Sequence, residues 1–349
     1  MIITRTPFRV TLGGGGTDLP SYYARHGGFI FAAAINKYMF INLNRPVVDD
    51  LVRVKYTKSE TVGHRDILQH DIAREGLRLT GIDRAVEITS MADVPAGTGL
   101  GSSSCYAVGL LNALHTMQRR PLGFQELAEE ACHLEMDILR KPVGKQDQYM
   151  AAFGGLTVLE ISPDGNVRVT PARVSDTTAE ELERNMLLFY TGCERPSDDI
   201  LTEQKHSLET NREQVVHSLH AIKEMGREIL EMIESGDLTS FGLALDRHWQ
   251  LKKRLASKVT SPRFDHIYDL AKKNGALGGK ISGAGGGGFF LLYTEGRHAQ
   301  LREALRAEGL REMRYRFEFD GTKVLVNLMD AMHNGNGSAV RPCQLVAHA

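Results

Sequence analysis

The sequence predicts an α+β protein of two domains, from its length and from the order of its strand-like and helical segments. At 349 residues the chain is long enough to bury two cores. Strand-like segments dominate the beginning, whereas the chain after about residue 185 becomes charged and helical and then gives a strand, a helix and two strands. We therefore expect one domain over residues 1–185, a second over 186–330 and a loose tail over 331–349.

Apolar alternation and helical periodicity locate the elements in order. The first strand is expected over 2–12 and ends in the four-glycine turn Gly13 to Gly16. Later strands are expected over 29–43, 52–56, 86–90, 156–161, 186–190, 289–293, 314–319 and 323–327. Helices are expected over 66–80, 105–114, 124–139, 196–235, 238–256, 262–273 and 296–308. His64 and His70 are expected to be surface residues rather than ligands.

Composition excludes several classes of function. The formal net charge of −1 gives nucleic acid no reason to bind. No run approaches the roughly 18 apolar residues of a membrane span, and the amino terminus has no signal-peptide pattern, so we expect no membrane partner. The four cysteines are Cys105, Cys132, Cys193 and Cys343. They are widely spaced, without the paired spacing of a metal site, and this pattern suits a reducing cytoplasm.

The stretch from Val94 to Ser104 is the strongest functional signal. Gly97, Gly99 and Gly101 occupy every second position, so backbone N–H groups there can approach a bulky anion. The serines that follow lead into an apolar helix, whose amino-terminal dipole favours a phosphate. The stretch lacks the lysine of a Walker A loop and the third glycine of a dinucleotide fingerprint. The alternative is a glycine-rich turn that only caps a buried helix.

Three motifs together resemble the GHMP kinases, the superfamily of galactokinase, homoserine kinase, mevalonate kinase and phosphomevalonate kinase. The segment Pro95–Ser104 is similar to the family's phosphate loop, and the segments Pro7–Asp18 and Lys280–Phe289 are similar to its other two signatures. The resemblance implies a two-domain fold, with an amino-terminal domain like domain 2 of ribosomal protein S5 and a ferredoxin-like α/β sandwich after it. It also implies ATP and Mg²⁺.

The resemblance implies roles for individual residues. The nucleotide phosphates would be bound by the loop residues Pro95, Gly97, Thr98, Gly99, Leu100, Gly101, Ser102, Ser103 and Ser104. Asp147 matches the catalytic acidic residue, and Arg9 would lie beside it and stabilise its negative charge. Ser103, with Ser102 as the near alternative, and Glu135 would hold magnesium. The alternative for Glu135 is a solvent-facing charge on a helix.

Further residues are expected at the acceptor. By the same resemblance, Thr17 and Asp18 would contact sugar hydroxyls, the alternative for Asp18 being an N-cap. The turn with Gly283, Ala284 and Gly285 would close the site from the second domain. Three basic residues close to Asp147 in sequence are candidates to bind a phosphate on the acceptor, the alternative being a solvated basic turn: Arg140, Lys141 and Lys145.

Details of the motifs resemble one branch of the superfamily, the bacterial D-glycero-D-manno-heptose 7-phosphate kinases. The details are the glycines before Thr17-Asp18, the segment 145–149 and the segment 249–253. The branch implies phosphorylation of an anomeric hydroxyl for nucleotide-activated heptose and surface polysaccharide. Another sugar 1-kinase, fucokinase-like or galactokinase-like, and a non-catalytic sugar-binding regulator are the alternatives. The expected partner is a small sugar or sugar phosphate in the cytoplasm, and a homodimer is left open.

Overall fold

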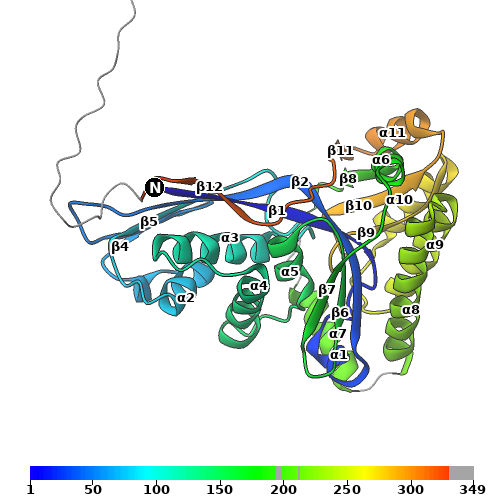
Figure 1. Ribbon diagram of the computed structural model, residues 1–349. Coiled ribbons are helices and arrows are strands. Elements are labelled where there is room, and N and C mark those ends of the chain that lie inside the picture. Colours follow the sequence, from blue (N-terminus) through cyan, green and yellow to red (C-terminus); the bar gives the residue numbers. More distant parts are fainter. Residues whose placement is uncertain (194–197, 211–212, 330–349) are drawn as a thin grey trace, which may run out of the picture.

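The computed structural model describes residues 1–193, 198–210 and 213–329, which form two β-sheets with helices packed against them (Figure 1). The segment 331–349, where a loose tail was expected, lies outside the described residues. Within the described chain, no helix is long and apolar enough to cross a membrane.

The first sheet is built around two long antiparallel strands, β1 (Ile2–Gly13) and β2 (Gly28–Asn44). Its main path runs β12-β1-β2-β5-β3-β4, and β6 and β7 extend it from the other end of β2. Apart from the parallel pair β3 and β5, the strands are antiparallel. The remaining bounds are β3 Val52–Lys55, β4 Ser59–Val62, β5 Val86–Ala92, β6 Leu156–Ile161, β7 Val167–Pro171 and β12 Lys323–Asn327.

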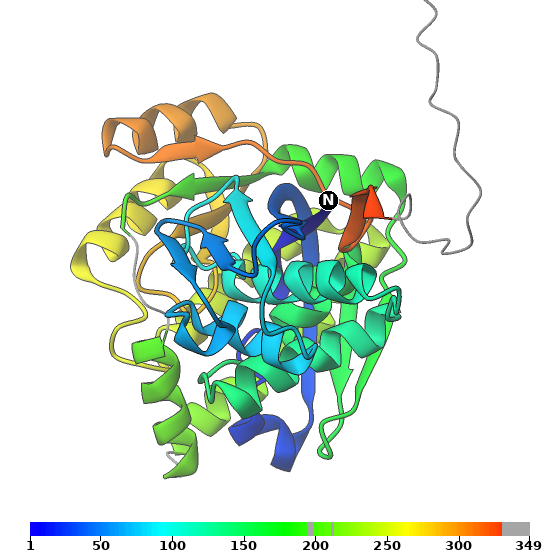
Figure 2. The same cartoon turned by 90° about the vertical axis from the view of Figure 1, so that its left-hand side faces the viewer.

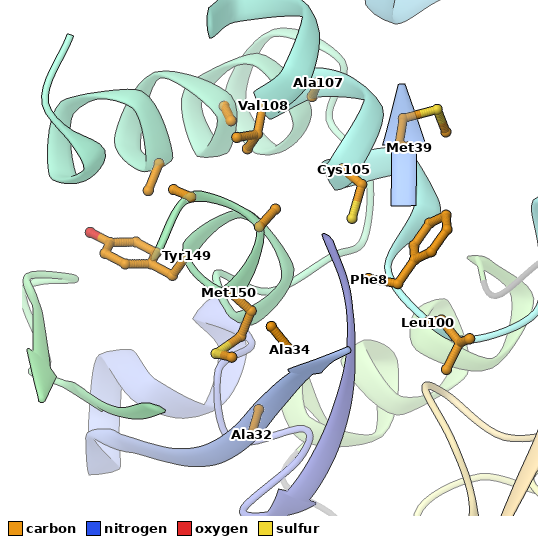
Figure 3. Packing of buried hydrophobic residues seen from close by; sticks show 14 of the residues in the cluster. Phe8, Ala32, Ala34, Met39, Leu100, Cys105, Ala107, Val108, Tyr149 and Met150 are labelled. Carbon is orange, nitrogen blue, oxygen red and sulfur yellow. The ribbon is translucent and has the colours of Figure 1, made fainter. Parts of the chain in front are cut away.

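Helices α2 to α5 lie together below one face of this sheet (Figure 1). The apolar helix α3 (Ser102–Met117) packs directly on β1 and β2, and α5 (Gln146–Phe153) packs beside it. Figure 3 shows side chains from both strands and both helices in this one core, among them Phe8, Ala32, Ala34, Cys105, Val108 and Met150. The other elements here are α1 Pro20–His26, η1 Arg65–Ile67, α2 Asp71–Leu79 and α4 Phe124–Cys132, which continues as the π-helical turn η2 His133–Ile138. The core thereby fixes the starts of α3 and α5 relative to β1.

The second sheet is antiparallel and runs β11-β8-β10-β9. Helix α9 (Leu238–Lys252) packs on β9, and α8 (Glu213–Ser235) packs on α9 and on β1 and β2 of the first sheet. The second sheet is therefore held close to the glycine turn at the end of β1. The remaining bounds are α6 Asp176–Asn185, β8 Met186–Tyr190, α7 Asp198–Glu209, α10 Pro262–Lys273, β9 Ala276–Ile281, β10 Phe289–Thr294, α11 His298–Ala307 and β11 Arg311–Met313.

Two expectations about the end of the chain are wrong. Residues 323–327 were assigned to the second domain, but they form β12, which pairs with Ile2–Arg5 of β1 (Figure 2). This pairing joins the beginning of the chain to the last strand of its described part, and no local pattern in the sequence indicates it. The strand expected over 314–319 is instead β11 at Arg311–Met313, and Phe317 makes only an isolated bridge to Ile35.

Candidate active site

One cavity of about 870 Å³ collects residues from both sheets. Its lining comes from β1, the glycine loop before α3, the start of α5, helices α7 and α9, and the turn between β9 and β10. The predicted residues on this lining are Arg9, Asp18, Pro95, Gly97, Gly99, Gly101, Ser102, Ser103, Ser104, Asp147, Gly283, Ala284 and Gly285. The fold therefore brings all three sequence motifs to one place.

The glycine loop has the backbone conformation that its sequence requires. Gly97, Gly99 and Gly101 all have positive φ, at 76°, 77° and 85°. Helix α3 begins directly after Gly101, and its first three residues line the cavity. The positive end of the helix dipole and the unpaired N–H groups of the first turn are therefore located at the cavity, and no acidic residue of that turn offsets them. Of the other predicted loop residues, Thr98 donates its hydroxyl to Pro95 O at 2.9 Å and Leu100 lies in the core. Neither of these two lines the cavity, so their side chains support the loop.

The turn between β9 and β10 closes on this loop from the second sheet. The Ser282 hydroxyl donates to Gly99 O at 3.0 Å. A Cβ atom at Gly283 would lie 2.6 Å from Gly99 Cα, so the two backbones touch and neither position has room for a side chain. The third motif therefore lies directly against the glycine loop, although the two belong to different sheets.

Arg9 and Asp147 both line the cavity and form an ion pair. The Arg9 guanidinium donates from Nε to Asp147 Oδ1 at 2.7 Å, its Nη2 lies 2.6 Å from the same oxygen, and its Nη1 donates to Gly99 O at 2.8 Å. Gln146 Nε2 also donates to Oδ1, at 2.9 Å. Within the described chain, Oδ2 has no donor, and it lies 3.2 Å from where a Cβ at Gly101 would be. One carboxylate oxygen is thus held in place, and the other is free against the loop.

Asp18 and Thr17 have different environments. Asp18 lines the cavity and accepts from Gly16 N–H at 3.2 Å and Gln146 N–H at 3.1 Å. Burial raises the pKa of Asp18, and the nearby charge of Asp147 raises it further, while the backbone N–H groups of Gln146 and of Asp18 itself and the charge of Arg9 lower it. Thr17 is fully buried, and its hydroxyl donates to Gly14 O and Phe29 O, both at 2.8 Å. The expected sugar contact of the Thr17 side chain is therefore not what the structure provides, because the turn itself uses this hydroxyl.

Glu135 lies directly behind the serines of the loop and is fully buried. The alternative of a solvent-facing charge on a helix is therefore wrong. Its carboxylate accepts from Ser103 Oγ at 2.5 Å, Ser104 Oγ at 2.6 Å and Gln148 Nε2 at 2.7 Å. Burial raises the pKa of Glu135, while the hydrogen bonds from Ser103 and Ser104 act in the opposite direction. Glu135 lies within the π-helical turn η2, where the helix is wider than an α-helix. Hydroxyl and carboxylate oxygens of this kind are the donors that Mg²⁺ prefers.

The predicted basic cluster is not brought into the cavity. Arg140 is exposed and has a positive φ of 53°. Lys145 donates to Glu129 Oε2 at 2.9 Å and to Gly165 O at 2.8 Å, outside the cavity lining. Lys141 lies between Asp71, at 3.4 Å, and Ser103 Oγ, also at 3.4 Å. Nearness to Asp147 in sequence was misleading for Arg140 and Lys145, because the chain turns just before α5 and directs these two side chains away from the cavity. Lys141 instead reaches Ser103 of the glycine loop.

Comparison with known proteins identifies the family. Residues 67–155 match the GHMP kinases N terminal domain, and residues 227–310 match the GHMP kinases C terminal domain. A D-glycero-alpha-D-manno-heptose 7-phosphate kinase of Campylobacter jejuni is 32% identical over 92% of this chain and 98% of its own length. The chain belongs to the GHMP kinases.

Two other similarities agree with this membership. An L-fucokinase/L-fucose-1-P guanylyltransferase of Bacteroides fragilis is 28% identical over 85% of this chain, which spans 35% of that protein. The crystal structure of a D-glycero-D-manno-heptose 1-phosphate kinase from Bacteroides thetaiotaomicron superposes with a TM-score of 0.75 at 25% identity, covering 94% of this chain and 99% of the other. Both are kinases of sugars or sugar phosphates by name, and the predicted two-domain GHMP kinase fold is confirmed.

This GHMP kinase also has cavity residues that the sequence did not assign. At one end, Tyr56, His70 and Tyr106 form an aromatic cluster, in which the His70 ring stacks on Tyr106 at 4.6 Å. The expectation of a surface role for His70 is thus wrong, since its ring also caps α2 through Ala73 N–H. Elsewhere the lining contains polar residues of the second half of the chain to which the sequence analysis gave no role, among them Gln204, His248, Lys252 and Lys280. Lys252 and Lys280 lie within segments that carried the resemblance, and this was their only signal.

Proposed function

We propose that this GHMP kinase transfers the γ-phosphoryl group of ATP to the anomeric hydroxyl of a sugar phosphate, D-glycero-D-manno-heptose 7-phosphate, and yields the 1,7-bisphosphate. The observation that carries the proposal is the Asp147 carboxylate, fixed by Arg9 through Oδ1 and free at Oδ2 beside the glycine loop. A phosphoryl transfer needs this combination of a phosphate cradle and a positioned proton acceptor.

The free oxygen of Asp147 determines the chemistry of the acceptor. The acceptor hydroxyl donates to Oδ2 and is thereby held in line with the γ-phosphorus. As the new O–P bond forms and the bond to the leaving β-phosphate oxygen breaks, the hydroxyl proton passes to Oδ2. Arg9, only 4% exposed, keeps its guanidinium on Oδ1 and on Gly99 O, so it fixes the carboxylate relative to the loop throughout. The Asp18 carboxylate accepts a hydrogen bond from a second hydroxyl of the sugar.

The two ends of the loop region suit the parts of ATP. The N–H groups at the start of α3 and the positive-φ glycines bind the phosphates. The aromatic cluster of Tyr56, His70 and Tyr106 offers ring faces and edges to the nucleobase. The Tyr106 hydroxyl is buried without a hydrogen-bond partner among the described residues, and a polar base would supply one.

Ser103 and Glu135 fit a magnesium ion bound together with the nucleotide. Their oxygens lie 2.5 Å apart, and both are of the hard type that this cation prefers. Mg²⁺ is usually shared between one or two protein oxygens and substrate phosphates. Bound there, the ion would neutralise phosphate charge.

The choice of acceptor is supported by the relative from Campylobacter jejuni, whose name gives heptose 7-phosphate as its substrate and 98% of whose length this chain covers. A fucokinase-like 1-kinase is the second candidate, favoured by the likeness to the L-fucokinase/L-fucose-1-P guanylyltransferase. A non-catalytic regulator would have no need for the intact pair of Arg9 and Asp147. We place the reaction in the cytoplasm, on the way to nucleotide-activated heptose for surface polysaccharide.

A panel of acceptors tests the proposal. ADP release is followed in a coupled assay with ATP and magnesium for heptose 7-phosphate, free heptose, L-fucose and galactose, and without acceptor. The proposal expects the highest kcat/KM with heptose 7-phosphate. A higher kcat/KM with L-fucose or galactose identifies the second candidate, and no acceptor-dependent turnover supports the regulator.

A further inference from the structure

The acceptor side of the cavity carries buried positive charge that the chain itself does not neutralise. Lys252 and His248 lie one turn apart on α9, and Lys280 lies on β9, so all three come from the second half of the chain. His248 is 1% exposed and Lys280 is 2% exposed, while Lys252 is partly accessible within the cavity.

The two lysines donate hydrogen bonds only to backbone carbonyls among the described residues, and the imidazole of His248 has no hydrogen-bond partner there. Lys252 Nζ donates to Ile281 O at 2.7 Å and to Gly283 O at 2.5 Å, and Lys280 Nζ donates to Leu12 O at 2.9 Å. No carboxylate of the described chain lies within ion-pair distance of either amine. Both ring nitrogens of His248 and Nε2 of the buried Gln204 have no partner there either. Buried polar groups are nearly always satisfied, so these point to an absent, anionic ligand.

Electrostatics agree with this geometry. Burial, followed by the charge of Arg9, lowers the pKa of Lys252 to about 7. Burial and the neighbouring lysines also lower the pKa of His248, and burial with Lys252 and Arg9 lowers that of Lys280. An anion in contact with these groups would favour their charged forms and so would be bound more tightly than by exposed lysines.

The cluster begins at the turn that contacts the glycine loop, where Lys252 donates to Gly283 O, and it extends from there toward the acceptor side. The nucleotide phosphates have their own cradle in the glycine loop and the start of α3. Lys280 instead reaches Leu12, three residues along β1 from Arg9 toward the glycine turn and Asp18, a distance of roughly 10 Å along a strand. The non-reacting phosphate of the acceptor would then lie toward Leu12, and its reacting end would lie at Asp147.

We propose that Lys252, Lys280 and His248 form the subsite for the non-reacting phosphate of the acceptor. The inference rests on the proposed function, and it replaces the basic cluster of Arg140, Lys141 and Lys145 that the sequence suggested. The occupant is a phosphomonoester dianion, bound by two amines and, when protonated, by the imidazole. The same chemistry would suit the transferring γ-phosphoryl group, and the test below separates the two sources.

The test compares heptose 7-phosphate with free heptose in the full-length enzyme at fixed ATP and magnesium. Lys252→Gln and Lys280→Met should each lower kcat/KM for the phosphorylated sugar by about 10–100-fold, mainly through KM, and leave that for free heptose within about 3-fold. Lys253→Met is the matched control, because Lys253 directly follows Lys252 at the end of α9 but pairs with Asp265 away from the cavity. A second measurement covers the case that Lys280→Met folds poorly. Thermal unfolding is measured without nucleotide, in the presence and absence of heptose 7-phosphate. The sugar phosphate should raise the melting temperature of the wild type and leave that of Lys252→Gln unchanged.

Other outcomes overturn the inference. An equal loss with both sugars would mean that the lysines act on the nucleotide, and an unchanged preference would mean that the phosphate is bound elsewhere. In both cases the wild type still prefers heptose 7-phosphate, so the proposed function stands. A wild type without this preference contradicts the acceptor of the proposed function itself.

Discussion

Replacing Asp147 with asparagine should nearly abolish transfer and leave nucleotide binding intact. The Asn oxygen can still accept from Arg9, so the guanidinium, which also bonds Gly99 O, keeps its place beside the loop. The amide cannot take a proton at the position of the free Oδ2. Loss of a positioned base lowers kcat by about 10²–10⁴-fold, which corresponds to roughly 3–5 kcal/mol of transition-state stabilisation.

The assay measures kcat from ADP release with saturating sugar phosphate, and the Kd of ATP by calorimetry. Asp137→Asn is the matched control, because Asp137 is an exposed side chain that pairs with His133 outside the cavity. The Asp147→Asn protein should unfold close to the wild-type melting temperature, because a hydrogen bond from Arg9 to the Asn oxygen replaces the ion pair of Arg9 and Asp147. An Asp147→Asn enzyme that retains more than about a tenth of wild-type kcat would refute the role of Asp147 as base.

Three further predictions concern the loop, the metal and the acceptor subsite. Gly101→Val should weaken ATP binding by about 100-fold, because a branched side chain at φ 85° would lie against the Asp147 carboxylate; calorimetry should show normal binding for Gly81→Val, whose position has similar strain but no neighbour within 4 Å. Glu135→Gln should raise the magnesium concentration for half-maximal activity by about 10–100-fold, with exposed Glu228→Gln as control, and an unchanged magnesium dependence would remove Glu135 from the metal site. Because the pKa of Lys252 is lowered to about 7, the amine is charged below that pH and loses its charge above it. KM for heptose 7-phosphate, relative to free heptose, should therefore rise as pH increases from about 6 to about 8, and Lys252→Arg, charged throughout, should flatten the rise. Arg9, His248 and Lys280 face the same group; an equal rise in Lys252→Arg would assign the titration to His248 or Lys280.

The sequence predicted those parts of the site that are continuous in the chain or fixed by backbone conformation. Alternating glycines before an apolar helix leave few structures other than a cradle, and the structure gives them positive φ at the start of α3. The element pattern was equally informative where periodicity was strong, as for β6, β8 and α10, whose bounds agree with the prediction.

The remaining parts depend on contacts that no local pattern encodes. Lys145 is two residues from Asp147 in sequence, yet it turns to Glu129, whereas Lys280 is far along the chain and reaches the same cavity. Thr17 looked available, but the glycine turn uses its hydroxyl. The pairing of β12 with β1 and the orphaned nitrogens of His248 arise only when both sheets are in place. Charge near the reactive group in sequence was thus a poor guide to charge near it in space.

The position of the new phosphate tests the central claim most directly. The purified enzyme is incubated with ATP, magnesium and D-glycero-D-manno-heptose 7-phosphate, and the product is examined by phosphorus NMR with proton coupling. The proposed function predicts a second phosphate signal coupled to the anomeric proton, in equal amount to the retained 7-phosphate, and no such signal with Asp147→Asn. A new phosphate coupled to any other sugar proton, or ADP formation without a bisphosphate, would contradict the claim.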